Sequence, residues 1–505
     1  PIQWVREPAV LEPAEATYSG APVLHNERPN NILTEGFVAS GNAEEALLNS
    51  VHVIENQYKT PFIEHAYIEP EAGYAFRDGD RIIIQGCTQA PFMNKDSIAD
   101  ILGLGSEDVR IIPTGCGGGF GSKLDLSYQP YIALAAWKLN RPVGIVYSRH
   151  ESMLTTTKRH PSEISIKVGC DENFKITAID FHGVFNTGAY ASWGPTVANR
   201  VPVHASGPYQ VANYLAKSRA VHTNNVPAGA FRGFGVPQTA IALETSLSEL
   251  AQKAGADELN FRLINALRNG TPTVTGQVFS SGVGITKCLE AVRPAWERAK
   301  KYSSQYNNAL GESIHKKGVG IATCWYGCGN TSIANPSTIR IGIKQNGQII
   351  LHQGATDIGQ GSNTVITQIV ADAIQTDINS IELIGPDTDL TPDAGKTSAS
   401  RQTFISGEAA SLAGKALREK ILRHANVGEN ARIKSGPTGL YIEDSKRYHQ
   451  VDLCHLPLDE FGYVLSVQES YDPVTTPLDE NGQGDPYALY GYGVQIAELT
   501  VDTEL

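Results

Sequence analysis

Four segments of this chain are rich in glycine or in small polar residues and run directly into a stretch of helical periodicity. They are Gly115–Lys123 (GCGGGFGSK), Ala230–Gln238 (AFRGFGVPQ), Asp357–Thr364 (DIGQGSNT) and Thr397–Thr403 (TSASRQT). The start of a helix offers free backbone N–H groups and the positive end of the helix dipole. Glycine lets an anionic group approach the backbone closely. Four such junctions, far apart in the sequence, predict one large anionic cofactor that several segments hold together.

The second of these loops carries a cation. Arg232 stands between Phe231 and Phe234, with glycine after each of Arg232 and Phe234. An arginine on a glycine loop can form a fork of hydrogen bonds to a carboxylate or polarise a carbonyl group. A structural ion pair is the alternative for Arg232. We expect the two phenylalanines to belong to the core.

Three further segments hold side chains that could take part in chemistry. Gln89 follows a predicted strand, where its amide can donate to a ligand oxygen or remain a satisfied surface amide. Tyr326 lies in the run CWYGC and is either a core aromatic or a residue that stacks on a substrate. The charged run 158–161 (KRHP) is predicted to be a solvated turn.

The common nucleotide and metal motifs are missing from these loops. After Gly115 and Gly117 the third glycine position of a dinucleotide fingerprint holds Phe120, and Lys123 follows serine instead of glycine, so no Walker loop is present. Cys324 and Cys328 form a pair without a second pair nearby, which does not predict a zinc or iron–sulfur site. A tight glycine turn without a ligand is the structural alternative for the first loop.

Composition restricts the function classes. The chain has 505 residues, 41% of them hydrophobic and 19% charged, with a net charge of −12. The acidic balance argues against a nucleic-acid partner, and no apolar run of about 18 residues predicts a membrane helix. Seven scattered cysteines are typical of reduced thiols in the cytoplasm. The chain starts at Pro1 and stops within a predicted strand, so we expect it to be incomplete at both ends.

Periodicity predicts an α+β fold of mixed sheets and helices. Expected strands and helices alternate irregularly along the chain. The predicted strands are 51–58, 81–86, 109–113, 143–147, 163–168, 175–185, 338–344, 349–353 and 492–501. The predicted helices are 96–104, 128–139, 239–254, 257–268, 364–374 and 406–422. Strand, glycine loop and helix follow one another in both 109–139 and 338–374, which predicts two related domains. The polar stretch 300–318 is predicted to be a turn-rich boundary or linker.

The loop motifs together resemble one known family. The runs GGGFG at 117–121, AFRGFGVPQ at 230–238, IGQG at 358–361 and TSAS at 397–400 are similar, in this order, to the molybdopterin-binding part of the xanthine dehydrogenase/aldehyde oxidase family of molybdenum hydroxylases. The resemblance covers essentially the whole chain. It implies two molybdopterin-binding domains, which we place at 46–310 and, C-terminally truncated, at 311–505. The weakly periodic segment 1–45, which contains Pro and Glu, is predicted to be a connector from a missing N-terminal domain.

The resemblance also implies cofactors and partners. Molybdenum would be held by the dithiolene of molybdopterin, in its cytosine dinucleotide form, with no protein ligand, and with oxo and sulfido or selenido ligands. Iron–sulfur clusters and FAD would lie on other subunits or domains, so we expect a cytoplasmic hetero-oligomer. The cofactor-binding positions that the resemblance implies are Gln89, Gly119, Phe120, Gly121, Arg232, Gly359, Gln360, Gly361, Ser398, Ser400, Arg401 and Gln402.

For the reaction, the resemblance assigns catalytic roles to Gln89 near the apical oxo group and to Arg232 at the substrate. Phe279, Tyr326, Leu124 and Arg232 would line the substrate site. Leu124 stands where purine hydroxylases carry a glutamate, which puts purine recognition in doubt. The catalytic glutamate of the family is expected outside this chain.

Within the family, the runs 118–125, 325–330 and 401–403 look most like nicotinate dehydrogenases of the clostridial type, with the large and medium molybdopterin subunits joined in one chain. The implied reaction inserts oxygen derived from water into an N-heteroaromatic ring such as nicotinate. Two alternatives stay open: an aldehyde oxidoreductase, and an inactive cofactor-binding fragment.

Overall fold

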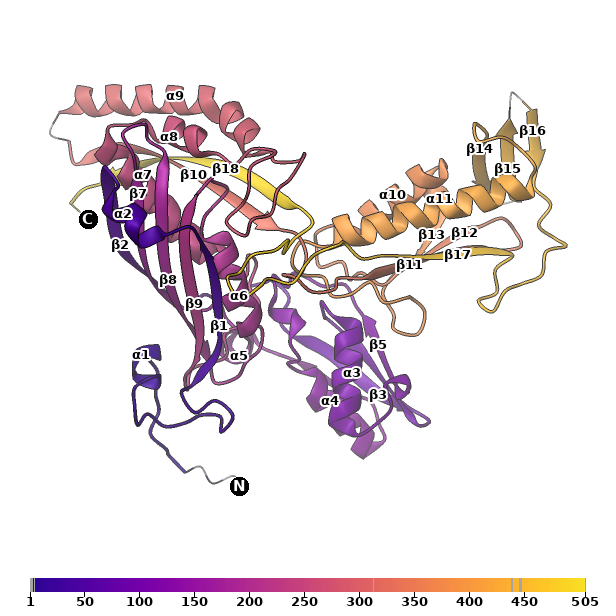
Figure 1. Cartoon of the computed structure of the whole chain (residues 1–505). Coiled ribbons are helices and arrows are strands. Elements are labelled where there is room, and N and C mark those ends of the chain that lie inside the picture. The colour runs from indigo at the N-terminus through magenta and orange to yellow at the C-terminus, as the bar shows by residue number, and fades with distance from the viewer. Residues whose placement is uncertain (1–2, 4, 312, 437–438, 445–446, 505) are drawn as a thin grey trace. The chain divides into compact units, whose positions relative to one another are not determined.

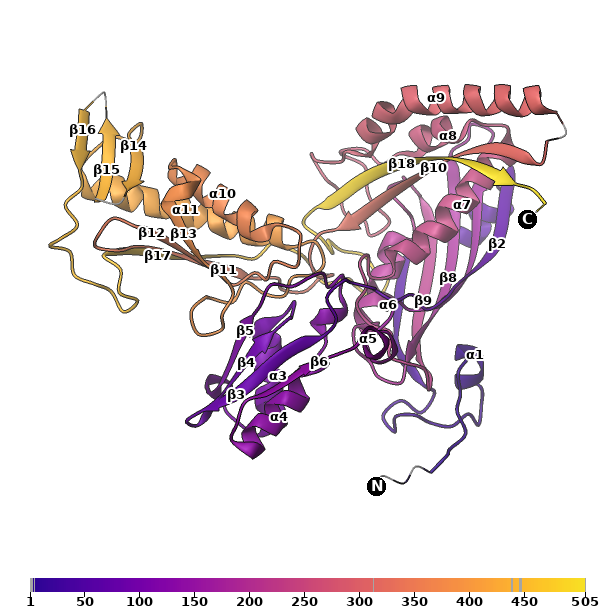
Figure 2. The ribbon, with the colours of Figure 1, turned by 180° about the vertical axis from the view of Figure 1, so that it is seen from behind.

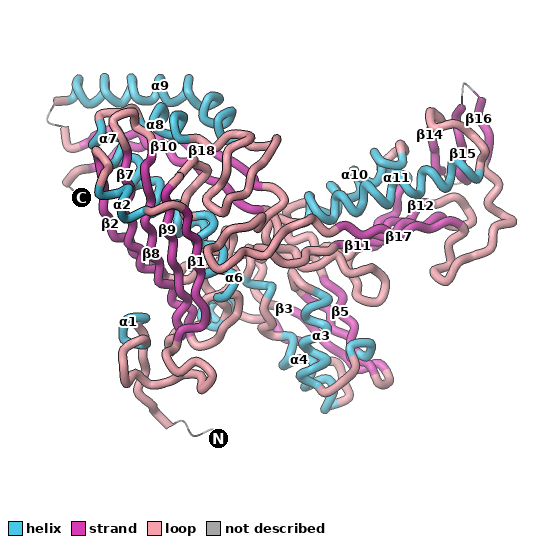
Figure 3. Tube along the Cα trace, viewed as in Figure 1, coloured by secondary structure: helices cyan, strands magenta, loops and turns pink. Residues whose placement is uncertain are grey.

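The chain folds into two compact units, each built from segments that are discontinuous in sequence (Figures 1 and 3). The computed structural model describes residues 3, 5–311, 313–436, 439–444 and 447–504. The first unit comprises Pro1–Glu64, Thr157–Ile333 and Thr475–Leu505, and the second comprises His65–Thr156 and Ala334–Val474. The predicted division at 45 and 310 follows the order of the sequence, whereas the compact units interleave. The α+β class with mixed sheets is confirmed.

A five-stranded sheet organises the first unit. In spatial order its strands are β1 (Ile32–Ser40), β9 (Asn213–His222), β8 (Ile176–Gly188), β7 (Ser162–Cys170) and β2 (His52–Thr60). Only β8 and β9 run parallel, and β7 and β8 form the predicted hairpin. Strand β1 lies within the segment that was predicted to be a connector. Its partner β9 is remote in the sequence, so local periodicity could not reveal the strand.

Helices and a second, two-stranded sheet cover this sheet (Figure 2). Helix α7 (Val236–Ala254) contacts β2, β7 and also β10 (His315–Gly327), so it lies between the two sheets. Strand β10 pairs with β18 (Tyr490–Asp502), and α9 (Ile285–Leu310) packs on both of these strands. The other helices of the unit are α1 (Pro13–Ala16), α2 (Ala43–Leu48), α6 (Gly194–His204) and α8 (Glu258–Asn265).

Helix α9 corrects one prediction. Residues 300–310 were expected to be turn-rich, but they continue the helix that begins at Ile285. The helix buries Trp296 and Ala299 on one side and leaves most of its polar C-terminal half exposed. A solvated helix face therefore resembles a linker in composition.

The second unit contains a β-β-α-β-α-β arrangement twice. The first copy comprises β3 (Ala72–Asp78), β4 (Arg81–Gly86), α3 (Pro91–Leu102), β5 (Val109–Pro113), α4 (Gln129–Leu139) and β6 (Val143–Val146). The second comprises β11 (Ser337–Ile343), β12 (Ile349–Gln353), α10 (Ser362–Ile374), β13 (Ile381–Ile384), α11 (Gly407–His424) and β17 (Leu465–Tyr471). The sheet orders, β5-β4-β3-β6 and β13-β12-β11-β17, correspond strand by strand. The repeat inferred from the sequence thus lies within one unit.

This topology positions four loops. In each copy the first two strands are antiparallel, and the strand after the first helix is parallel to the second strand. The carboxyl ends of β4 and β5 therefore share one edge of their sheet, as do those of β12 and β13 of theirs. Loops at such edges are the usual place for ligands in open sheets with helical crossovers.

Smaller elements complete the second unit. They are α5 (Arg149–Thr155) and a three-stranded sheet of β14 (Arg432–Gly436), β15 (Gly439–Asp444) and β16 (Arg447–Gln450). Helix α3 begins at Pro91 and not near Asp96 as predicted, because proline is favoured at the first helical position. Among the described helices, none combines the length and apolar character needed to span a membrane.

Candidate functional site

Gln89 is the central residue of the strand-end loops in the second unit. It follows β4, and its side chain is 2% exposed, so the alternative of a surface amide is wrong. Its Oε1 accepts from the Gly121 N–H at 2.9 Å, and its Nε2 donates to the Thr397 carbonyl at 2.7 Å. The Thr397 N–H donates back to the Gln89 carbonyl at 2.8 Å. One buried amide thus joins the first and the fourth glycine-type loops.

Thr397 extends this network to the third loop. Its hydroxyl donates to the Thr356 carbonyl at 2.7 Å and accepts from Gln402 Nε2 at 3.2 Å. Gln360 Nε2 donates to the same Thr356 carbonyl at 3.2 Å. Segments that follow β4, β5, β12 and β13 are therefore linked through Gln89 and Thr397. The predicted convergence of distant loops holds for the first, third and fourth loops.

Strained backbone marks two of these loops. Phe120 has φ 51°, and Ala399 and Ser400 each have φ 54°. Residues other than glycine seldom adopt this left-handed region, and such residues cluster at functional sites. Phe120 is also 40% exposed, although it is a large apolar side chain. A bound planar group would give this ring a partner and account for the strain.

The first loop needs glycine where it meets Gln89. A Cβ added at Gly119 would fall on Oε1 of Gln89, and Gly121 has φ 117°, which only glycine adopts readily. A Cβ added at Gly115 would meet nothing within 4 Å. The tight part of the loop is therefore the part that contacts Gln89. Leu124, at the end of this loop, is 2% exposed.

The loops fit a large polar cofactor such as a pterin. The hydroxyl oxygens of Thr356 and Ser398 are enclosed and have no hydrogen-bond partner in the described part of the chain. Enclosed hydroxyls normally find a partner, so these two can bind a ligand that approaches the loops. Gly359 and Gly361 face open space, because an added Cβ at either would meet nothing within 4 Å.

Some donors of the third loop are already used by the protein. The carboxylate of Asp357 accepts from the N–H groups of Gly359, Gly361 and Asn363 at 2.9, 3.2 and 3.1 Å. The Gln360 amide also folds onto its own loop, where Oε1 accepts from the Ile358 N–H at 2.7 Å. This loop is therefore held in a fixed shape before any ligand binds, and an anion would meet Asp357 close by.

Arg401 and Gln402, two predicted cofactor contacts, face the protein interior. Arg401 is 2% exposed and donates to the carbonyls of Asn335 and Pro336 at 2.7 and 2.6 Å. Burial lowers the pKa of its guanidinium to about 10. Gln402 starts a π-helical turn, Gln402–Ser406, that leads into α11. Such turns are frequent at functional sites. In this structure both side chains position the loop that carries Ser398 and Ser400.

The second glycine loop lies in the first unit and presents Arg232. Phe234, two residues later, has φ 45° and is buried, whereas Arg232 is exposed. No acidic side chain or hydrogen-bond acceptor pairs with the Arg232 guanidinium among the described residues. The alternative of a structural ion pair is therefore not seen. The charge is available to a ligand.

The segment beneath this loop corrects another prediction. Lys158, Arg159 and His160 were expected in a solvated turn, but they are 7%, 9% and 1% exposed. Arg159 donates to the Arg232 carbonyl at 2.9 Å, and its guanidinium lies 3.8 Å from the centre of the Phe231 ring. A buried cation thus supports the backbone of the loop. Runs of charged residues are usually solvated, so composition alone led to the wrong prediction of a solvated turn at 158–161.

Tyr326 and Phe279 belong to one aromatic cluster in the first unit. Phe279 packs edge-on against Tyr490 at 5.8 Å, and Tyr326 lies 5.9 Å from the ring of His204, which contacts Tyr490 at 5.8 Å. Trp325 stacks on Tyr490 at 4.3 Å. Burial raises the pKa of the Tyr326 phenol to about 12, so it stays protonated. Both predicted substrate-lining residues are therefore half-buried on the same cluster.

Sequence reasoning missed a buried arginine that joins this cluster to the second loop. Arg200, on α6, is fully buried and donates to the Gly329 carbonyl at 2.6 Å. Its guanidinium lies 4.8 Å from the Tyr326 ring and 5.4 Å from the Phe234 ring. The local sequence of α6, which mixes apolar and polar residues, gave no signal, because a charged residue in such a segment usually lies at a solvated position.

His204, one turn after Arg200, is also buried. Burial and the nearby Arg200 charge lower its pKa to about 3, so the imidazole is neutral. Its Nδ1 lies 2.9 Å from the Arg200 carbonyl, and its Nε2 accepts from the Gly327 N–H at 3.0 Å. The Nδ1–H tautomer satisfies both bonds. His204 thus holds the backbone next to Tyr326.

Comparisons with known proteins define the class. Models of the molybdopterin cofactor-binding domain match residues 24–266 and 289–505. The chain belongs to the xanthine dehydrogenase/aldehyde oxidoreductase family of molybdopterin-binding enzymes. The loops around Gln89 and around Arg232 are therefore parts of molybdopterin-binding domains.

Individual relatives support this assignment. The chain is 32% identical over 524 residues to a xanthine dehydrogenase molybdenum-binding subunit of Escherichia coli O157:H7, covering 100% of this chain and 66% of the relative. It is 36% identical over 293 residues to the nicotinate dehydrogenase large molybdopterin subunit of Eubacterium barkeri. This match covers 58% of this chain and 68% of the relative. The structure matches aldehyde oxidoreductase from Desulfovibrio gigas with a TM-score of 0.88 at 25% identity. This match covers 98% of this chain and 52% of that chain. The chain thus spans between half and about two thirds of these relatives.

Proposed function

We propose that this chain is the molybdopterin-binding catalytic portion of a hydroxylase that acts on an N-heteroaromatic substrate such as nicotinate. In the overall reaction the substrate C–H and one water become C–OH, with release of two electrons and two protons. The similarity to the nicotinate dehydrogenase large molybdopterin subunit supports this substrate class.

The observation that carries the proposal is the exposed guanidinium of Arg232, which has no partner in the described part of the chain. A carboxylate on an aromatic ring can form two parallel hydrogen bonds with such a group. The buried Arg159 and the left-handed Phe234 fix the backbone on both sides of Arg232. A cation held in this way orients an anionic substrate and stabilises negative charge that develops on the ring during reaction.

Within the second unit, we assign cofactor binding to the loops joined by Gln89 and Thr397. Gln89 uses one N–H on Thr397, which leaves the second N–H of its amide for a ligand. Thr356, Ser398 and the open Gly359–Gly361 turn would hold polar edges of the pterin, in its cytosine dinucleotide form. When bound, this group supplies the two-electron oxidation and activates the water whose oxygen is inserted.

The remaining parts of the enzyme belong to other subunits or domains in this proposal. Two electrons leave through iron–sulfur clusters and FAD on these other parts, so the working form is a hetero-oligomer. We place this hetero-oligomer in the cytoplasm. That the Escherichia coli relative is itself described as a molybdenum-binding subunit supports this arrangement. The catalytic base, a glutamate, would come from outside the residues present here.

The second candidate is an aldehyde oxidoreductase. The TM-score of 0.88 with the Desulfovibrio gigas enzyme favours it. Leu124 also suits an uncharged substrate, because it is apolar where purine hydroxylases carry an acid. In both candidates Phe279 and Tyr326 would supply aromatic surface to the substrate.

Steady-state oxidation by the purified holo-complex separates these candidates. We expect nicotinate to be oxidised with a kcat/KM at least about tenfold above that of benzaldehyde, because the carboxylate adds one charge-assisted contact. Preference for benzaldehyde would favour the aldehyde oxidoreductase. A complex that contains molybdenum but oxidises neither compound would favour the inactive cofactor-binding fragment.

A further inference from the structure

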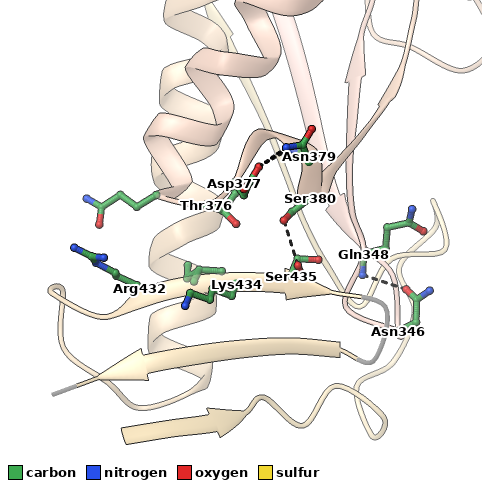
Figure 4. A pocket seen from close by; sticks show the side chains of 11 residues that line it. Asn346, Gln348, Thr376, Asp377, Asn379, Ser380, Arg432, Lys434 and Ser435 are labelled. Carbon is green, nitrogen blue, oxygen red and sulfur yellow. Dashed lines mark hydrogen bonds between the residues drawn. The ribbon is translucent and has the colours of Figure 1, made fainter. Parts of the chain in front are cut away.

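A cavity of about 960 Å³ lies in the second unit, away from the cofactor loops (Figure 4). Its walls are β14 on one side and the turn Thr376–Ser380 after α10 on the other, with Asn346 and Gln348 of the β11–β12 turn at one end. The third glycine loop precedes α10, whereas this cavity follows it. The 13-residue helix separates the two by roughly 20 Å.

The cavity is lined by hydrogen-bonding side chains. Amides come from Asn346, Gln348, Gln375 and Asn379, and hydroxyls from Thr376, Ser380 and Ser435. No aromatic ring is present among the described lining residues, so a nucleobase would find no stacking surface. Amides and hydroxyls in this density suit a ligand with many hydroxyl groups.

The charge available in the cavity is positive. Arg432 is exposed and has no acidic partner among the described residues. Lys434 adds a second cation, whose ion pair with Glu443 measures 3.4 Å. The carboxylate of Asp377 accepts from the backbone N–H and the Nδ2 of Asn379 at 2.8 and 2.9 Å, so it serves its own turn. On a chain of net charge −12, an unpaired arginine in a polar cleft favours an anion.

One hydrogen bond joins the two walls of the cleft. Ser380 donates to the Ser435 carbonyl at 3.2 Å across the cleft, which fixes the distance between its two walls. The spacing of the cleft walls is therefore fixed by the protein itself.

We propose that this cleft binds a hydrophilic phosphate ester of the sugar-phosphate class. The phosphate contacts Arg432, and the hydroxyl groups of the sugar contact the amides. Arginine matches phosphate by two parallel hydrogen bonds. The volume is that of a site for a small organic molecule, larger than phosphate alone requires.

Calorimetric titration of the purified holo-complex with ribose 5-phosphate, inorganic phosphate and ribose tests the proposal. We expect ribose 5-phosphate to bind at least about tenfold more tightly than phosphate, and ribose not to bind. The variant Arg432→Gln should weaken binding at least about tenfold, whereas Arg423→Gln, an exposed arginine on α11, should leave it unchanged.

Two results would overturn the proposal: no heat of binding with ribose 5-phosphate at millimolar concentration, or equal affinities for Arg432→Gln and Arg423→Gln. Equal binding of phosphate and ribose 5-phosphate would overturn the sugar-phosphate class. Molybdenum content and substrate oxidation, measured on the same samples, should be the same in all variants. A failure of the proposed hydroxylase activity would therefore be seen separately.

Discussion

Gln89 and Thr397, which are 308 residues apart, exchange two hydrogen bonds: the Gln89 amide donates to the Thr397 carbonyl at 2.7 Å, and the Thr397 N–H donates to the Gln89 carbonyl at 2.8 Å. They join the two copies of the β-β-α-β-α-β arrangement at the edges where the parallel strands end. The copies also share an ion pair between Arg110 and Asp387 at 2.6 Å. The cofactor loops are thus fixed by the contact between the copies.

Replacing Gln89 by methionine should destabilise the second unit. Methionine has a similar size but leaves the Gly121 N–H and the Thr397 carbonyl without partners. Two unsatisfied buried groups cost about 2–6 kcal/mol together, at about 1–3 kcal/mol each. Urea unfolding measures the change, and molybdenum content should also fall. Gln252→Met, at an exposed position on α7, is the matched control. Equal stability of the two variants would contradict the assigned role.

Two glycine substitutions in the first loop test whether the close contact with Gln89, and not the glycine content of the loop, requires a residue without a side chain. Gly119→Ala places a methyl group on the Gln89 amide, whereas Gly115→Ala places one in open space. We expect Gly119→Ala to lower stability by about 1–3 kcal/mol and to reduce cofactor content, because the amide must leave its partners. Gly115→Ala should behave as the parent protein does. Similar losses in both variants would show that the loop responds to any added methyl group.

Arg232→Ala should lower kcat/KM for nicotinate by about a hundredfold or more, since a charge-assisted contact in the transition state is lost. Molybdenum content should stay the same, because the side chain is exposed and unpaired. Arg298→Ala, at an exposed position on α9, is the control. An unchanged kcat/KM in Arg232→Ala would remove this residue from the substrate site.

His204 should make stability depend on pH. Its pKa is lowered to about 3 in the folded protein, mainly by burial, whereas a free imidazole titrates near 6.5. Between these values the unfolded chain binds the proton and the folded chain does not, so stability falls as the pH decreases from about 6.5 towards 3. The slope contributed by one such group approaches ~1.4 kcal/mol per pH unit.

His204→Gln tests this directly, because glutamine keeps an acceptor for the Gly327 N–H but does not titrate. Urea midpoints at pH 7, 6 and 5 should fall less steeply in the variant than in the parent protein. His160, whose pKa burial also lowers to about 3, remains in both proteins and provides a common background. Identical pH dependence of the two proteins would show that His204 does not carry the effect.

Local periodicity predicted about half of the described strands and helices of this chain. Strands β4 and β5 have the predicted bounds, and the Asn346-Gly347 turn joins β11 to β12 as expected. Strand β1 was missed because its partner is remote in the sequence. Helix α9 was missed as a whole, and its C-terminal half was expected to be a linker because polar residues on a solvated helix resemble a loop.

The site was predictable where glycine and strand ends coincide. Glycine content identified the loops around Gly119, Gly359 and Arg232, but Thr356 and Thr397 lie at positions that depend on the pairing of the two copies. Arg200 and His204 could not be found in the sequence, because nothing local distinguishes a buried charge from a solvated one. Only packing shows that the guanidinium of Arg200 lies 5.4 Å from the ring of Phe234 and 4.8 Å from that of Tyr326.

The central claim is that the loops joined by Gln89 and Thr397 hold a molybdenum pterin. Elemental analysis of the purified holo-complex, with release and identification of the pterin nucleotide, tests it most directly. We predict about one molybdenum and one pterin cytosine dinucleotide per chain, with both reduced in Gln89→Met and retained in Gln252→Met. A correctly folded complex that contains neither molybdenum nor pterin would contradict the claim.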